Sequence, residues 1–245
     1  MNAESEMRSR GKAAGIHFLI SFGIVATLLF ACFVIWFWPP VFCATGLLGL
    51  VWLILLVDLC AGPLATFVVW KKGKKGLLFD LVVIAAIQSL FLGYGIYTVS
   101  ESRPAFYVFV VDDFELVSAA AVIWPVRQVD MRLGFFSTPA YVGAKFSEDP
   151  AIRKAQQEAE MFSGISLARR PEAYVSIESR AGDLVSKARS LEQLVAYNSQ
   201  NKMRDILGLY PSAAGYLPLK ANAEDMTVLI DQHGKVLGMV DLRPW

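Results

Sequence analysis

Two acidic residues inside long apolar stretches are the clearest candidates for chemistry in this sequence. Asp58 interrupts the apolar run from Val41 to Trp70, and Asp80 lies near the start of the run from Leu77 to Val99. Two carboxyl groups on adjacent helices would suit an aspartyl protease, which needs them about 3 Å apart to share one proton. Their depths differ by about eight residues, or roughly 12 Å along straight helices, so we expect no such dyad. Asp80 is instead close enough to Lys75 to reach lipid headgroups or the neighbouring lysines.

Asp58 and Gln88 are expected at the same depth. Asp58 lies 13 residues before Lys71, and Gln88 lies 13 residues after Lys75, which is roughly 20 Å at helical rise. An acid in the middle of a bilayer costs about 2.5–3.5 kcal/mol on insertion scales, so it faces a partner or a cavity. These two side chains are placed to form a hydrogen bond, which is most favourable with Asp58 protonated, the form that burial favours. We also expect Gly62-Pro63 to kink the helix and to free carbonyl groups near the acid.

Small side chains recur every four positions in two of the apolar runs. Such stripes let helices approach closely in lipid. The stripes either pack the helices of this chain together, or one of them receives a helix from another protein. Their residues are Gly23, Thr27 and Ala31 in the first run, and Ala85, Ser89 and Gly93 in the third.

Other signals for catalysis or metal binding are weak. His233 is expected on a hairpin turn, where a lone histidine usually lies at the surface without a chemical role. Asp112-Asp113 could bind a cation, although an acidic turn after a strand is the commoner arrangement. No nucleophile elbow, zinc spacing or P-loop is present in the sequence. We therefore expect no enzymatic activity, with no catalytic residue, cofactor or metal.

The elements that position these residues follow from composition. Of the 245 residues, 55% are hydrophobic and 18% charged, with a net charge of +1 that argues against a nucleic-acid binder. Three apolar runs, at about 16–38, 41–70 and 77–99, are each long enough to cross a hydrocarbon core of ~30 Å. We predict an integral membrane protein with three N-terminal transmembrane helices within 16–99, after a cytoplasmic segment 1–15. The first run is too long for the apolar part of a cleaved signal peptide.

The loops predict the orientation of these helices. Positive charge favours the cytoplasm, and four lysines lie in the connection Lys71–Lys75, whereas the connection around Pro39-Pro40 has no charge. The N-terminus and the lysine loop are therefore predicted inside. Residues 100–245 are predicted outside, in the periplasm if the membrane is the inner membrane of a Gram-negative bacterium.

Residues 100–245 show mixed strand and helix signals. The runs 105–111 and 114–123 are typical of strands, and 227–230 with 236–240 predict a β-hairpin. A helix is expected to start at Ser147–Pro150 and to place Ile152, Ala155, Ala159 and Phe162 on one face, and a capping box at Ser190 predicts another helix to about Leu207. We therefore expect an α+β extracytoplasmic domain without disulfides, since the three cysteines all precede residue 61.

Several blocks of sequence, taken in their order along the chain, match the pattern of one known family. The blocks are Asp58–Leu64, Lys74–Gly76 with Phe79–Leu81, Gln88 with Tyr94-Gly95, Arg103-Pro104 with Val108–Asp112, Tyr216–Leu219 and Pro244-Trp245. Together they resemble the TfpX/TfpZ family of type IV pilin accessory proteins. The resemblance implies an inner-membrane protein of pilus biogenesis that accompanies a particular major pilin and supports its stability or assembly, without enzymatic activity.

The resemblance leads to a specific hypothesis about partner binding. A pilin helix, which has an acid near its start, would dock against the Asp58 region and one small-residue stripe, and the outer domain would contact the pilin head. The alternatives are a non-catalytic sensor or anchoring subunit of another bacterial envelope machine, and a membrane-bound enzyme. The residues expected to contact the pilin helix are Asp58, Gly62, Pro63, Ala85, Gln88, Ser89 and Gly93.

Overall fold

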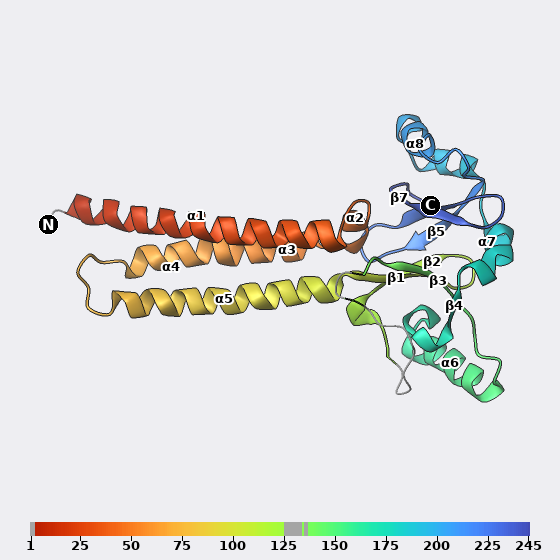
Figure 1. The fold of residues 1–245 in the computed structure, drawn as a ribbon, viewed down its shortest axis with the longest axis horizontal. Coiled ribbons are helices and arrows are strands. Elements are labelled where there is room, and N and C mark those ends of the chain that lie inside the picture. Colours follow the sequence, from red (N-terminus) through yellow and green to blue (C-terminus); the bar gives the residue numbers. More distant parts are fainter. Residues whose placement is uncertain (1–2, 125–133, 135–136) are drawn as a thin grey trace. The chain divides into compact units, whose positions relative to one another are not determined.

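The chain divides into two compact units, which are described separately (Figure 1). A computed structural model describes residues 3–124, 134 and 137–245. We call Met1–Ile35 with Leu47–Glu101 the helix unit, and Trp36–Gly46 with Ser102–Trp245 the sheet unit.

The helix unit consists of long apolar helices. Helix α1 spans Ala3–Trp36 and α5 spans Leu77–Ser102, and between them lie α3 (Leu48–Leu56) and α4 (Gly62–Val69). Within the described residues, three helical stretches are long and apolar enough to cross a membrane. The prediction of three long apolar helices near the N-terminus is therefore confirmed, and it indicates a membrane protein.

The second apolar run differs from the single helix expected over 41–70. Its first part is a short helix, α2 (Val41–Thr45), which ends at Gly46 with a left-handed φ of 70°. Ala44 is fully buried in the core of the sheet unit, and its carbonyl oxygen accepts a hydrogen bond of 3.0 Å from the Ala223 amide. Hydropathy did not separate the two parts because a protein core and a membrane select the same side chains.

The sheet unit is built on a mixed seven-stranded sheet with the order β4-β3-β1-β2-β5-β6-β7. The central hairpin β1–β2 is antiparallel, while β3 pairs with β1 and β5 pairs with β2 in parallel. The predicted mixture of helices and strands is confirmed. The strands are β1 (Pro104–Phe109), β2 (Phe114–Ser118), β3 (Ala140–Ala144), β4 (Tyr174–Ser176), β5 (Gly215–Lys220), β6 (Met226–Ile230) and β7 (Val236–Val240).

The core of the sheet unit contains large apolar side chains. Phe109 and Phe114 are fully buried, with ring centroids 5.4 Å apart across the β1–β2 hairpin. Leu217 and Val228 join them from β5 and β6. Besides α2, the described part of the sheet unit contains the helices α6 (Pro150–Ser163), α7 (Ala181–Lys187) and α8 (Gln200–Leu207).

The helix expected from Ser190 to Leu207 is divided in the structure. Ser190 caps a short 3₁₀ segment, Leu191–Ala196, and α8 starts separately behind a second cap, Ser199. Asn198 lies between the two segments, where it donates to the Arg243 carbonyl (2.8 Å) and accepts from the Arg243 amide (2.9 Å). This pairing with the C-terminal segment accounts for the interruption, and local sequence patterns do not reveal it.

Two blocks that the sequence singled out meet in the sheet unit. The hydroxyl of the fully buried Tyr216 donates a hydrogen bond of 3.0 Å to the carbonyl of Pro244. Thr227 donates to the carbonyl of Leu242 at 2.8 Å. The C-terminal segment is thereby fixed to the sheet.

Candidate functional site

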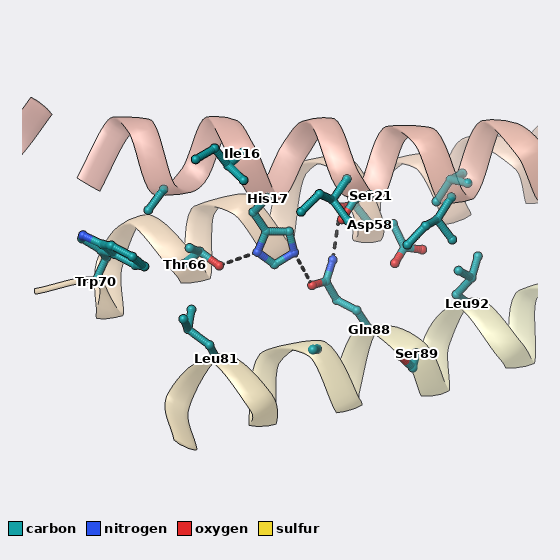
Figure 2. Close-up of a pocket in the computed structure, with 15 residues that line it drawn as sticks. Ile16, His17, Ser21, Asp58, Thr66, Trp70, Leu81, Gln88, Ser89 and Leu92 are labelled. Carbon is teal, nitrogen blue, oxygen red and sulfur yellow. Dashed lines mark hydrogen bonds between the residues drawn. The ribbon is translucent and has the colours of Figure 1, made fainter. Parts of the chain in front are cut away.

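A groove of about 430 Å³ lies between α1 and α5 of the helix unit, with the π-helical turn Val57–Ala61 and α4 as its floor (Figure 2). Both walls have residues at four-residue intervals, which places the residues of each wall on one face of its helix. The residues that line it are Ala13, Ile16, His17, Ile20, Ser21, Ile24 and Val25 from α1, Asp58, Thr66 and Trp70 from the floor, and Leu81, Ala85, Gln88, Ser89 and Leu92 from α5.

A chain of hydrogen bonds joins the helices along this floor (Figure 2). His17 Nε2 lies 2.7 Å from Gln88 Oε1, and because an amide oxygen only accepts, the histidine donates this bond. His17 Nδ1 lies 2.6 Å from the Thr66 hydroxyl, which donates to it when the ring is neutral. The Gln88 amide group donates in turn to the main-chain carbonyl of Asp58, at 3.2 Å.

The local fold explains why the Asp58 carbonyl needs this donor. Residues Val57–Ala61 form a π-helical turn, in which a carbonyl accepts from the amide five residues later. For Asp58 that residue is Pro63, which has no N–H group. The expectation that Pro63 would free a carbonyl near the acid thus has a structural counterpart, and Gln88 occupies the freed oxygen.

Gly62 leaves room for Gln88. A Cβ atom at this position would lie 2.0 Å from Gln88 Nε2 and 2.3 Å from its Cδ, closer than any real contact. A second glycine, Gly95 on α5, leaves room for the Ile54 side chain in the same way, because an added Cβ would lie 2.8 Å from that side chain. Gly62 and Pro63 are both buried, so they shape the groove from within its floor.

The Asp58 side chain is only 3% exposed and lines the groove. Its Oδ2 atom has no hydrogen-bond partner among the described residues. The sequence placed Asp58 and Gln88 together, and the structure does so too, but the bond that it shows is to the main chain of Asp58. The partners of the Gln88 amide are therefore a carbonyl and His17, and the carboxyl group is left for something else.

His17 is a groove residue that the sequence patterns did not identify. Its signal was present, because His17 is a polar residue within the otherwise apolar start of that run. Its partners could not be inferred from spacing, since they depend on how α1 is rotated against α4 and α5.

The small-residue stripe on α5 is open. Ala85 and Ser89 line the groove and are exposed, and a Cβ at Gly93 would meet nothing within 4 Å. The stripe Gly23, Thr27 and Ala31 on α1 is exposed as well. Neither stripe is buried between the helices of this unit, so the reading in which they pack the three helices together loses its support.

The other sequence candidates have ordinary partners. Asp80 pairs with Lys74 at 2.6 Å, as its nearness to the lysine loop predicted. Asp113 lies 2.5 Å from Lys220, so its charge is already balanced within the sheet unit. His233 lies exposed on the β6–β7 turn, as expected. Within the described part of the chain, no group of three or more His, Cys, Asp or Glu residues could hold a metal ion.

Among the titratable groups of the sheet unit, Glu115 is a carboxyl group whose pKa is shifted by burial. Burial raises the pKa of the Glu115 carboxyl, and the hydroxyl of Ser166, which donates to it at 2.7 Å, offsets part of that effect. Glu115 is adjacent to a balanced ion pair rather than to a second reactive group, so the arrangement indicates a structural role.

Comparisons with known proteins show which proteins the chain is similar to. No family model and no solved structure matches it. Two fimbrial assembly proteins of Dichelobacter nodosus, of serogroups E1 and I, are each 26% identical to it over 244 residues, covering 94% of both chains. A third, of serogroups C1 and C2, is 33% identical over 114 residues, which are 46% of this chain and 87% of that relative. The chain belongs to the family of fimbrial assembly proteins.

The groove of this fimbrial assembly protein lies wholly in the helix unit. It combines apolar walls with one buried carboxyl group, of which Oδ2 lacks a hydrogen-bond partner among the described residues. Such a lining is suited to holding an apolar segment that has a single polar group.

Proposed function

We propose that this fimbrial assembly protein is an accessory protein of type IV pilus biogenesis, of the TfpX/TfpZ kind. It binds the major pilin in the inner membrane and supports the stability or assembly of that pilin. The names of the relatives support a role in fimbriae. The observation on which binding rests is the groove between α1 and α5, with an open small-residue stripe on one wall.

The proposal includes a membrane location for the helix unit. Large apolar side chains such as Leu78, Leu90 and Tyr94 on α5 are at least 70% exposed, which suits a lipid environment and not water. The lysine loop favours a cytoplasmic position for the α4–α5 connection, which places the N-terminus in the cytoplasm and the sheet unit in the periplasm.

The two units would have different tasks in this function. The groove would hold the apolar helix of a pilin, with Ala85 and Ser89 allowing close approach of the two backbones. The sheet unit would contact the pilin head, for which α6 offers an exposed apolar face. That face includes Ile152 and Phe162, which are 50% and 80% exposed.

A photo-crosslinking experiment in intact cells tests the proposal. The probe is placed at Ser89, which faces the groove, with Leu90 as a matched control on the same helix and Ser212 as a probe of the sheet unit. We expect the major pilin to crosslink at Ser89 and much less at Leu90. Crosslinking only at Ser212 would move recognition to the sheet unit, and no pilin at any position would favour another envelope machine.

The proposed role is non-catalytic, and this part has its own test. Asp58→Asn is compared with the unmodified chain for turnover in membrane extracts and for the level of the major pilin. We expect no chemical activity to depend on Asp58. Loss of an activity with normal pilin levels would replace the proposal with a membrane-bound enzyme.

A further inference from the structure

The partner that the groove lacks can be described from its chemistry. The polar groups of the floor bond to one another: Thr66 to His17, His17 to Gln88, and Gln88 to a main-chain carbonyl. Asp58 Oδ2 is buried and has no such partner within the described residues. A buried polar atom without a partner is costly, because it has lost its bonds to water and gained none in return.

The described lining also contains no lysine or arginine. None of its hydrogen bonds reaches Asp58 Oδ2. An ionised carboxylate accepts at this oxygen, and so does a neutral carboxyl group whose proton is on Oδ1, so a hydrogen-bond donor from outside the chain would satisfy it. Lipid acyl chains have no donor, so lipid filling the groove would leave it unsatisfied.

The shape of the walls indicates what could bring the donor. Ile16, Ile20 and Ile24 form a row on α1 with a spacing of four residues, and Leu81, Ala85 and Ser89 form a matching row on α5. Rows of this kind create the ridges and grooves into which the side chains of another helix pack. An apolar helix with one polar side chain therefore matches both the walls and the floor.

We infer that Asp58 is a recognition residue, and that the groove selects a membrane helix with a side-chain hydrogen-bond donor at the depth of Asp58. This inference rests on the proposed function, because it describes the occupant of the same groove. It adds a requirement on the partner: an apolar helix of equal length without the donor binds less well. In Figure 2 the Asp58 side chain lies in the space between α1 and α5, beside the bonded chain of His17 and Gln88.

The test uses the full-length protein in bacterial membranes, with a photo-reactive residue at Ser89. The probes are two co-expressed single-span helices of leucine and alanine, which differ only by Asn or Leu at the depth of Asp58. One interhelical hydrogen bond changes association by about three- to thirtyfold. We expect the Asn helix to crosslink more than the Leu helix within that range.

Substitutions at Asp58 decide whether the acid is responsible. Asp58→Leu is expected to make the two helices equal, and Asp58→Asn, which keeps a side-chain oxygen acceptor, is expected to restore most of the difference. Crosslinking of the Leu helix serves as the folding control, because it should be the same in all variants. A preference for Asn that survives Asp58→Leu, or no preference in the unmodified chain, would overturn the inference.

The same probe separates this inference from the proposed function. If the major pilin crosslinks at Ser89 equally in the unmodified chain and in Asp58→Leu, pilin binding stands and recognition by Asp58 is wrong. If pilin never crosslinks at Ser89 while the Asn helix still depends on Asp58, recognition by Asp58 stands and the pilin is not the occupant.

Discussion

In the sheet unit large aromatic and aliphatic side chains fill the interior, beside a few buried polar ones such as Thr227. In the helix unit Asp58 and Thr66 are buried, and many large apolar side chains lie outside. Leu90 on α5 is 74% exposed, while Phe114 on β2 is fully buried. The sheet unit is therefore stabilised by removing apolar surface from water. The helix unit instead owes its specific packing to a few polar contacts and to close backbone approach.

The largest expected difference between the units comes from truncating a phenylalanine in each. Phe114→Ala removes a fully buried ring that packs against Phe109, so the free energy of unfolding should fall by about 3–5 kcal/mol. Phe91→Ala truncates a ring that is 56% exposed and should change stability much less in detergent. Thermal unfolding of the purified protein measures both. Equal losses would mean that the helix unit also depends on apolar burial.

A pair of glycine substitutions tests close approach within the helix unit. Gly62→Ala forces the Gln88 amide off the Asp58 carbonyl, which should lower the free energy of unfolding by about 1–3 kcal/mol. The better helix propensity of alanine should offset about 1 kcal/mol of this loss. Gly49→Ala on α3 meets nothing within 4 Å and should be neutral or stabilising. Unfolding in a mixed-detergent titration measures the difference. A harmless Gly62→Ala would show that Gln88 is not held as described.

The hydrogen bond between His17 and Gln88 should give a smaller effect. A double-mutant cycle of His17→Leu and Gln88→Leu should show a coupling of about 0.6 kcal/mol, the average for hydrogen bonds between membrane helices, with about 1.7 kcal/mol as the upper limit. The control cycle replaces Gln88→Leu with Leu90→Ala on the exposed side of α5 and should show no coupling. A coupling as large in the control cycle would contradict a direct bond.

The smallest effect concerns pH and the sheet unit. Burial raises the pKa of Glu115 in the folded chain, so the folded state holds this proton more tightly than the unfolded state. The resulting stabilisation is complete below the ordinary glutamate pKa of about 4.3 and is lost as pH rises through the raised pKa. Glu115→Gln should therefore unfold at a higher temperature than the unmodified chain at pH 8, with a smaller advantage at pH 4. Glu158→Gln, on exposed α6, should show no such trend.

The sequence was sufficient for the features that depend on residue type, and insufficient for those that depend on packing. It predicted three apolar helices, the β6–β7 hairpin and the contact between Asp80 and the lysine loop. It placed Asp58 and Gln88 at one depth, but it could not show that Gln88 binds the main chain, because the π-helical turn is a property of the folded backbone. It also could not separate α2 from the helix unit, because Ala44 and its neighbours look the same in either environment.

The bond from Gln88 to the Asp58 carbonyl has a consequence for how partners could be exchanged during evolution. Gln88 on α5 bonds to the main-chain carbonyl of residue 58 and not to its side chain. The identity of that side chain is therefore not needed to keep α5 in place. Partner preference at this position is thereby uncoupled from the scaffold. A single substitution at position 58 could therefore change which helix is preferred during evolution, while the rest of the groove stays the same.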